Sequence, residues 1–326
     1  MIFTRTPFRV SFAGGGTDLS DYYRREEGVV LSTTINKYMF ITVNNLSEFY
    51  DHRIRVAYSK VEMVNDVSQI RHPLVREALL MVGCPPGIEI HSMADIPAGT
   101  GMGSSSAFTV GLLNALHAHS GRIATREQLA AEACEIEIDR VGEPIGKQDQ
   151  YAAAFGGMNL IRFLPDERVV VEPVPVQPRR LRELNDRLLL LYTGSTRKAG
   201  EILMGQKAGT AEKLEELGRM KSLAVEMRDL VISERPLREF GELLHQGWEL
   251  KRNLSSGISN PLVDELYDAG RAAGAVGGKL LGAGGAGFLL FYVEPERRQE
   301  VRDALRQLNE VLFEFERGSS QIVYSI

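Results

Sequence analysis

The sequence is poor in cysteine and lacks any long hydrophobic run. Its two cysteines, Cys84 and Cys134, lie far apart and outside any C-x-x-C pair, so neither a zinc site nor a disulfide framework is expected. The longest apolar runs, 188–192 and 288–293, are far shorter than the roughly 20 residues that cross a bilayer. The first residues mix arginines with apolar side chains and do not resemble a signal peptide. We therefore expect a cytoplasmic protein without a membrane partner.

An excess of positive charge is also missing. The 326 residues include 38 Lys and Arg against 43 Asp and Glu, which gives a net charge of -5, and no basic domain or tail is visible. A nucleic-acid partner is therefore not expected, although local basic residues could still hold a small anionic substrate. The hydrophobic content of 44% is ordinary for a globular protein, and the length favours two domains.

Glycine, by contrast, is abundant, and the most informative glycine-rich stretch is 96–107, I-P-A-G-T-G-M-G-S-S-S-A. Glycines at alternate positions free the backbone for positive φ, and an apolar run with helical character follows. Ser104 is predicted to be the N-cap of that helix, whose N-terminus would favour an anion. The stretch predicts a phosphate cradle, and the alternative is a glycine-rich turn before an ordinary buried helix. Because the lysine of a Walker A loop is missing, Mg²⁺ and other groups would have to balance the phosphate charge.

Residue patterning predicts an α+β protein. Strands are expected at 2–12, 29–43 (as one strand or two), 54–58, 87–93, 158–163 and 169–174 (paired as a hairpin), 188–192, 288–293, 311–315 and 322–324. Helices are expected at 73–82, after the glycine loop, at 125–141, 201–233, 236–253, from Pro261, and at 296–308. A proline-rich run at 173–178 is the expected boundary between domains at 1–178 and 179–326.

Three carboxylates are candidates for chemistry, and each has a structural alternative. Asp18 follows the turn 14–16 and could bind sugar hydroxyls or cap a short helix. Asp149, in G-K-Q-D-Q-Y, could be a buried catalytic carboxylate or a helix N-cap. Glu137 belongs to a charged helix whose acidic residues by themselves indicate a solvated face.

A second glycine-rich stretch covers 274–287 and contains G-A-G-G-A-G, a formal match to the dinucleotide-binding fingerprint. That motif requires a helix after it, whereas a strand is expected at 288–293. The dinucleotide interpretation is therefore rejected. We expect the two glycine loops to meet at the domain interface, where ligand pockets commonly lie.

Three segments in sequence order resemble the signature segments of the GHMP kinases. They are T-P-F-R-V-S-F-A-G-G-G-T-D-L, P-A-G-T-G-M-G-S-S-S-A and K-L-L-G-A-G-G-A-G-F, and together they span nearly the whole chain. The resemblance implies an N-terminal domain like ribosomal protein S5 and a ferredoxin-like C-terminal domain. Within the family, the first segment and G-K-Q-D-Q-Y are most similar to D-glycero-D-manno-heptose 7-phosphate kinases and to the kinase half of bifunctional fucokinases.

The resemblance assigns roles by position. Asp149 would be the catalytic base and Arg9 its basic partner, while Ser105 and Glu137 would hold Mg²⁺. ATP would be bound by Pro97, Gly99, Gly101, Met102, Gly103, Ser104, Ser105 and Ser106. The substrate would be bound by Gly15, Gly16, Thr17, Asp18, Arg197, Gly284 and Gly285. Two departures from the family pattern stand out: Gly15 and Gly16 replace an E-H pair, and the third segment ends in G-A-G-F.

The implied activity is ATP-dependent phosphorylation of an anomeric hydroxyl, with D-glycero-D-manno-heptose 7-phosphate converted to the 1,7-bisphosphate. Basic candidates for its distal phosphate are Arg53, Arg55, Arg71, Arg197, Lys198 and Lys279. The alternatives are an anomeric kinase of a free fucose- or galactose-type sugar, a decarboxylase of the mevalonate-diphosphate type and a non-enzymatic sugar sensor. The presence of Ser105, Glu137 and Asp149 favours an enzyme over a sensor. Oligomeric state is not predicted.

Overall fold

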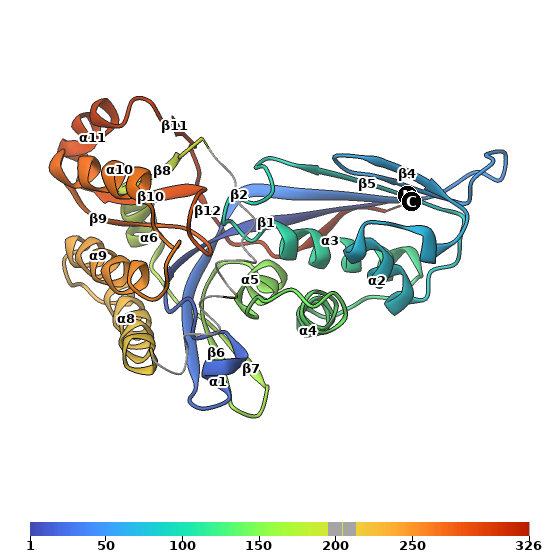
Figure 1. Cartoon of the computed structure of the whole chain (residues 1–326), viewed down its shortest axis with the longest axis horizontal. Helices are drawn as coiled ribbons and strands as arrows, with labels where there is room; N and C mark the ends of the chain where they lie inside the picture. The colour runs from blue at the N-terminus through green and yellow to red at the C-terminus, as the bar shows by residue number, and fades with distance from the viewer. Residues whose placement is uncertain (195–203, 205–212, 326) are drawn as a thin grey trace.

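The computed structural model describes residues 1–194, 204 and 213–325. Within these residues the strands form two sheets, a larger one that runs through the narrow end of the molecule and a smaller one at the broad end (Figure 1). The mixture of helices with largely antiparallel sheets confirms the predicted α+β class.

The larger sheet has the order β13-β1-β2-β5-β3-β4; in addition β12 and β6 pair with β2, and β7 pairs with β6. Its strands are β1 (Ile2–Ala13), β2 (Gly28–Asn45), β3 (Ile54–Ala57), β4 (Val61–Val64), β5 (Ile88–Ala94), β6 (Met158–Phe163), β7 (Val169–Pro173), β12 (Phe315–Glu316) and β13 (Gln321–Ser325). All pairs are antiparallel except β3 with β5. The predicted hairpin of β6 and β7 is confirmed.

The spine of this sheet is β2, a strand of 18 residues. The sequence left open whether this region was one strand or two, and its β-branched residues form one continuous strand. It pairs with β1 along most of its length, with β6 at 28–33 and with β5 at 39–45. The register between β1 and β2 shifts between Pro7 and Phe8, immediately before Arg9.

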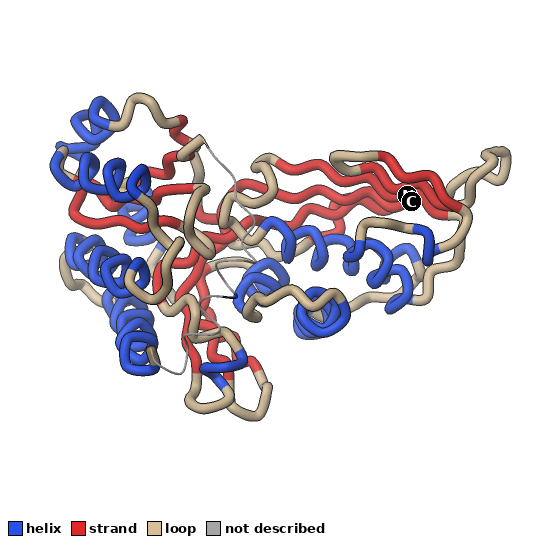
Figure 2. The backbone as a smooth tube through the Cα atoms, in the orientation of Figure 1, coloured by secondary structure: helices blue, strands red, loops and turns tan. Residues whose placement is uncertain are grey.

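Helices cover one face of the larger sheet in the narrow half, and none of the helices in the described residues lies on the opposite face there (Figure 2). The helical segments in the first half of the chain are α1 (Ser20–Tyr23), a 3₁₀ turn at Val67–Gln69, α2 (Pro73–Val82), α3 (Ser104–His119), α4 (Arg126–Cys134), a π-helical segment at Glu135–Arg140 and α5 (Gln148–Phe155). Helix α3 is buried on nearly all sides, which its apolar sequence requires.

The smaller sheet is antiparallel and has the order β11-β8-β10-β9. Its strands are β8 (Leu188–Tyr192), β9 (Ala275–Leu280), β10 (Phe288–Val293) and β11 (Asn309–Glu310). The helical segments of this half are α6 (Pro178–Asn185), α8 (Leu214–Ile232), α9 (Arg238–Arg252), α10 (Pro261–Ala272), a 3₁₀ turn at Pro295–Arg297 and α11 (Arg298–Ala304). The predicted strands at 188–192 and 288–293 are confirmed, while part of the helix predicted at 201–233 lies outside the described residues.

Strand β9 was not predicted, because glycine hid its pattern. A Cβ on Gly277 would lie 1.8 Å from the carbonyl oxygen of Gly241, and one on Gly278 would lie 2.6 Å from the Phe291 ring. These glycines therefore allow α9 and β10 to pack closely against β9. The helix predicted at 125–141 is not one regular α-helix, because α4 ends at Cys134 and a π-helical segment follows it.

The end of the chain returns to the larger sheet, so that β13 pairs with β1 and β12 with β2. Ile2 faces Ser325, and the two ends lie side by side (Figure 1). The proposed division after residue 178 falls directly after the first residue of α6, and it stays a prediction. One hydrophobic core includes Phe12 of β1 and Phe240 of α9, whose rings meet edge to face at 5.1 Å, so the two halves share packing.

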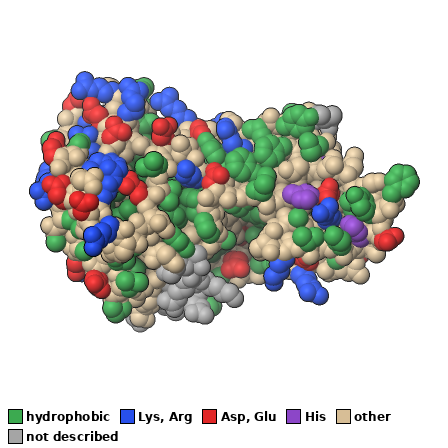
Figure 3. Space-filling model, turned by 90° about the horizontal axis from the view of Figure 1, so that it is seen from above, with side chains coloured by type: hydrophobic (Ala, Val, Ile, Leu, Met, Phe, Trp, Pro, Cys, Tyr) green, Lys and Arg blue, Asp and Glu red, His purple; other side chains and the backbone are tan. Residues whose placement is uncertain are grey.

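No helix in the described part of the chain is long and apolar enough to cross a membrane. On the face seen in Figure 3, basic and acidic side chains are interspersed rather than gathered into a patch of one sign.

Candidate active site

A pocket lies where the two glycine-rich loops touch. A Cβ on Gly101 would lie 2.5 Å from the carbonyl oxygen of Leu281, and one on Gly282 would lie 2.3 Å from the Cα of Gly101. Both glycines have positive φ, at 79° and 74°. Only glycine can be accommodated at such a contact, so the predicted meeting of the two loops is confirmed.

The loop before α3 delivers the N-terminus of that helix to the pocket. Gly103, with φ of 72°, is the N-cap, and Ser104 is the first helical residue. The prediction that Ser104 caps the helix was therefore wrong, because a glycine in the left-handed region already ends the loop. The Ser104 and Ser105 side chains reach the pocket, and a Cβ on Gly103 would lie 3.3 Å from Asp149. The first turn of α3 thus offers free N–H groups beside a carboxylate.

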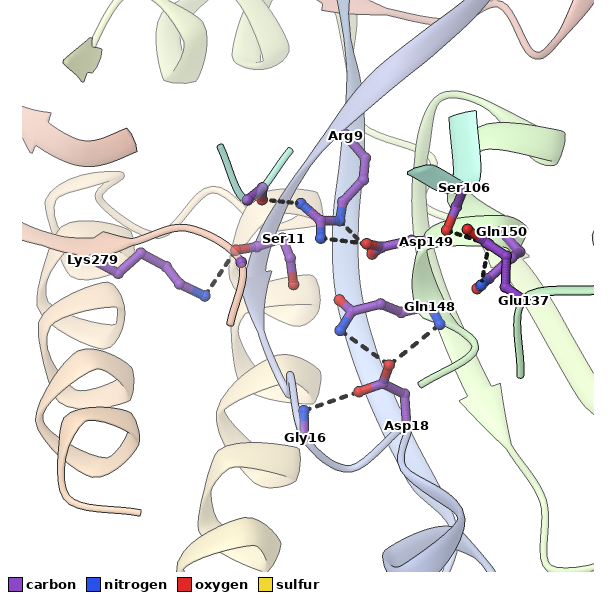
Figure 4. Close-up of polar contacts among 12 residues, drawn as sticks. Arg9, Ser11, Gly16, Asp18, Ser106, Glu137, Gln148, Asp149, Gln150 and Lys279 are labelled. Atoms are coloured by element: carbon purple, nitrogen blue, oxygen red, sulfur yellow. Dashed lines mark hydrogen bonds and ion pairs between the residues drawn. The ribbon is translucent and has the colours of Figure 1, made fainter. Parts of the chain in front are cut away.

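Asp149 is held by Arg9 through two parallel bonds (Figure 4). The Nε of Arg9 donates to Oδ1 at 2.6 Å, and Nη2 donates to Oδ2 at 2.7 Å. Arg9 also donates to the carbonyl oxygen of Gly101 at 2.7 Å, which ties the pair to the glycine-rich loop before α3. Arg9 is 5% exposed and Asp149 24%, so the carboxylate can still reach a ligand. Asp149 lies in the first turn of α5 but is not its N-cap, which is Lys147.

Glu137 is fully buried behind the first turn of α3 and accepts three hydrogen bonds. Ser105 donates at 2.5 Å, Ser106 at 2.8 Å and Gln150 at 2.6 Å. Burial raises the pKa of Glu137 to about 7, and nearby Asp149 adds to the rise. The π-helical segment 135–140 carries this side chain, in line with the frequent presence of such irregularities at functional sites. The solvated-face interpretation of Glu137 is thus excluded.

Asp18 lies on the other side of Asp149 (Figure 4). Its carboxylate accepts from the backbone N–H of Gly16 at 2.9 Å and from the side-chain amide of Gln148 at 3.1 Å. Burial raises the pKa of Asp18, and the negative charge of Asp149 adds to this. Gly146 packs against it so closely that a Cβ there would lie 2.0 Å from Oδ2. Asp18 does not cap α1, whose N-cap is Leu19.

Two buried lysines also line the pocket. Lys279 of β9 donates to the carbonyl oxygens of Ser11 at 2.8 Å and Phe12 at 2.9 Å. Lys251 of α9 donates to the carbonyl oxygen of Gly282. Burial lowers the pKa of Lys251 to about 8 and the pKa of Lys279 well below its usual value. Lys251 was missed from the sequence, since a lysine in the last turn of an amphipathic helix normally indicates a solvated position.

Most of the predicted site residues share this pocket. Those that line it are Arg9, Gly15, Gly16, Asp18, Gly99, Gly101, Gly103, Ser104, Ser105, Ser106, Asp149 and Gly284. Five others do not line it: Pro97, Met102, Glu137, Thr17 and Gly285.

Other contacts hold three of these five residues. Met102 is buried in the core, and Thr17 donates to the carbonyl oxygens of Gly14 and Val29. The backbone of Gly285 bonds to the segment 258–260 instead of facing the pocket.

Of the basic residues proposed to bind a distal phosphate, only some line the pocket. Lys279 lines the pocket, whereas Arg53, Arg55 and Arg71 do not, and Arg55 pairs with Glu89 at 2.9 Å. These three arginines come from the region of β3 and the approach to α2, and not from the segments that line the pocket. Arg197 and Lys198 lie outside the described residues.

Two family models and several known proteins match this chain. The family model of the GHMP kinases N terminal domain matches residues 68–157, and that of the GHMP kinases C terminal matches residues 227–312. A D-glycero-alpha-D-manno-heptose 7-phosphate kinase of Campylobacter jejuni is 31% identical over 323 residues, which cover 94% of this chain and 93% of that relative.

Two further proteins resemble the chain over most of its length. A bifunctional fucokinase/GDP-fucose pyrophosphorylase of Arabidopsis thaliana is 26% identical over 92% of this chain and 31% of the relative. The crystal structure of a D-glycero-D-manno-heptose 1-phosphate kinase of Bacteroides thetaiotaomicron superposes with a TM-score of 0.80 at 28% identity, over 100% of both chains.

Proposed function

The chain belongs to the GHMP kinase family and is an ATP-dependent sugar kinase, and from this premise we propose that its acceptor is the anomeric hydroxyl of D-glycero-D-manno-heptose 7-phosphate. The product would be the 1,7-bisphosphate. The 31% identical relative named as a heptose 7-phosphate kinase supports this acceptor class. The observation that carries the proposal is the Arg9–Asp149 pair, held against the glycine loop in a pocket that also contains Asp18.

In the proposed reaction Asp149 accepts the proton of the attacking hydroxyl. Arg9 contacts both carboxylate oxygens and so fixes their direction, while each oxygen keeps a lone pair for the substrate. The glycine loop and the first turn of α3 would bind the phosphates of ATP through backbone N–H groups and serine hydroxyls. Phosphoryl transfer needs mainly positioning and charge stabilisation from the protein, which this arrangement can supply.

Ser105 and Glu137 fit a magnesium ion. Both offer oxygen, and Mg²⁺ is commonly held by one or two carboxylates together with substrate phosphates. Glu137 is a buried carboxylate whose hydrogen-bond donors are all neutral, so a cation would stabilise its ionised form. No group of three or more His, Cys, Asp or Glu side chains in the described residues could hold a metal, which leaves phosphate oxygens to complete the coordination. When bound, the ion would neutralise charge on the β- and γ-phosphates.

Asp18 and Gln148 would bind hydroxyl groups of the sugar. Asp18 already accepts bonds from Gly16 and Gln148, which hold it in place beside Asp149. The Oε1 of Gln148 is buried and has no partner in the described part of the chain, so it is available to accept a bond from a hydroxyl. Gly15 and Gly16 line the same side of the pocket, and their missing side chains leave room for a bulky acceptor.

A screen of acceptors tests the proposal. ATP consumption is measured with heptose 7-phosphate, fucose, galactose and mannose, and phosphorus NMR locates the new phosphate in the product. We expect turnover with heptose 7-phosphate and a new signal from an anomeric phosphate. Turnover confined to a free sugar would contradict the proposed acceptor and favour the fucose-type alternative, which the fucokinase relative supports.

A further inference from the structure

Three buried polar side chains in the pocket have no role in the transfer step described above. Lys251 of α9, Lys279 of β9 and Ser11 of β1 come from three separate elements and all line the pocket. Their exposed fractions are 6%, 5% and 6%. Burial of two ammonium groups in one pocket is costly unless an anion compensates them.

The protein itself compensates the lysines only in part. An ammonium group has three donors, and Lys251 uses one of them, on the carbonyl oxygen of Gly282. Lys279 uses two, on the carbonyl oxygens of Ser11 and Phe12. Within residues 1–194 and 213–325, neither lysine has a carboxylate at ion-pair distance. Three N–H donors of the two side chains therefore remain for a ligand.

Ser11 provides an independent sign of a ligand. Its hydroxyl is buried and finds no hydrogen-bond partner among the residues that the structure describes. In Figure 4 the hydroxyl points into the space between the ends of Lys279 and Gln148. Buried polar atoms are nearly always bonded, so an unpartnered hydroxyl at the wall of a pocket indicates a polar group that binds there.

The unsatisfied groups face the acceptor side of the pocket. The charges that act on the Lys251 ammonium are those of Arg9, Asp18 and Asp149, which surround the proposed sugar site. The phosphates of ATP would instead lie at the N-terminus of α3, beside Ser105 and Glu137. An anion that reaches Lys251, Lys279 and Ser11 would therefore belong to the acceptor.

We propose that Lys251, Lys279 and Ser11 form the subsite that binds the phosphate group of the acceptor sugar. This inference rests on the proposed function, because it identifies what distinguishes a sugar phosphate from a free sugar in the same pocket. Two ammonium groups and a hydroxyl provide charge-assisted bonds to phosphate oxygens, while Asp18 and Gln148 remain for the hydroxyl groups of the ring.

The test compares kcat/KM for D-glycero-D-manno-heptose 7-phosphate with kcat/KM for the same heptose without its phosphate. Wild-type protein is expected to favour the phosphorylated sugar. Lys251→Met, which keeps length but removes charge, should lower this preference about 10- to 100-fold through KM, the range of one charge-assisted bond. Lys251→Arg should recover part of it. Ser11→Ala should lower the preference about 3- to 10-fold, and it keeps the test decisive if Lys251→Met does not fold.

Ser32 offers a matched control. It pairs with Ser11 across β1 and β2, is also buried and has an unpartnered hydroxyl within the described chain, but it does not line the pocket. Ser32→Ala should therefore leave the preference unchanged. An unchanged preference in Lys251→Met and Ser11→Ala, or an equal loss of kcat with both sugars, would overturn the subsite while the proposed function stands. A wild-type protein indifferent to the phosphate would overturn both.

Discussion

Asp149 and Glu137 are carboxylates near the same pocket, yet their surroundings suit them to different tasks. Asp149 is partly exposed and paired with Arg9, so it can meet a substrate proton in a fixed orientation. Glu137 is fully buried among neutral donors, and its pKa is raised to about 7. Such a division of environments is how one pocket assigns separate roles to two similar groups.

Replacement of Asp149 should remove proton acceptance without removing the nucleotide site. We expect Asp149→Ala to lower kcat roughly 10²- to 10⁴-fold, the usual contribution of a general base, while ATP still binds. Steady-state kinetics and equilibrium titration with ATP measure the two effects separately. Asp139→Ala, which removes an exposed carboxylate nearby, serves as the control. A near-normal kcat in Asp149→Ala would refute the base assignment.

Glu137 should make the metal-free protein less stable as pH rises. Its folded pKa of about 7 exceeds the ordinary value of 4.5 for a glutamate, so the folded state binds the proton more tightly than the unfolded state. The free energy of unfolding should therefore fall between pH 4.5 and 7, by on the order of 3 kcal/mol from this group, and level off above. Urea unfolding with a chelator present, in wild type and Glu137→Gln, measures it. Parallel pH profiles for the two proteins would contradict the assignment.

The elements around the pocket act through backbone contacts as much as through side chains. The loop before α3 and the loop after β9 touch at Gly101 and Gly282, where no side chain could fit. Arg9 binds the carbonyl oxygen of Gly101, and Lys251 binds that of Gly282. The contact therefore places the proposed phosphate loop, the proposed catalytic pair and the proposed anion subsite in one arrangement.

Gly101→Ala should break this contact, and Gly121→Ala is its matched control. Both glycines have positive φ, at 79° and 70°, so both substitutions carry a similar backbone strain of about 1–2 kcal/mol. A Cβ on Gly121 would meet nothing within 4 Å, whereas one on Gly101 would lie 2.5 Å from Leu281. We expect Gly101→Ala to lose activity at least tenfold beyond Gly121→Ala and to unfold at lower temperature. Equal activity in the two variants would contradict the role of the contact.

Whether an element could be predicted from the sequence depended on whether its pattern is set by neighbouring residues or by packing against distant segments. Runs such as 188–192 read directly as strands, and the loop before α3 was recognisable because its glycines and serines have a local role. Strand β9 was not predicted because its glycines allow close packing of segments that are distant in sequence. Lys251 was not predicted for the same reason, since only tertiary packing turns its helix face toward the pocket. Features that depend on neighbouring residues could be predicted from the sequence, whereas close contacts between distant segments could not.

At the scale of the whole molecule, the last residues close the structure that the first residues begin. Strand β13 pairs with β1. Ser320, which immediately precedes β13, makes buried side-chain contacts with β1 and α3. Its hydroxyl bonds to that of Thr6 at 2.8 Å and accepts from Asn114 of α3 at 3.1 Å. All three side chains are buried, so this link is shielded from water.

Ser320→Ala should destabilise the protein by about 1–3 kcal/mol. The change leaves the buried amide of Asn114 without this acceptor, and an unsatisfied buried group carries a cost of that size. Ser319→Ala is the control, since Ser319 is buried to the same degree and makes only a 3.4 Å contact with the adjacent carbonyl. Chemical denaturation of both variants measures the difference. Equal stability would show that the Ser320 link contributes nothing.

The return of β12 and β13 also sets an order for biosynthesis. The polypeptide leaves the ribosome from its N-terminus, so β1 and β2 are made long before the strands that flank them in the larger sheet. During translation the outer edge of β1 stays unpaired until residues 321–325 emerge. The first half therefore completes its sheet only after the second half has been synthesised, and an unfinished nascent chain exposes a strand edge that chaperones would have to shield.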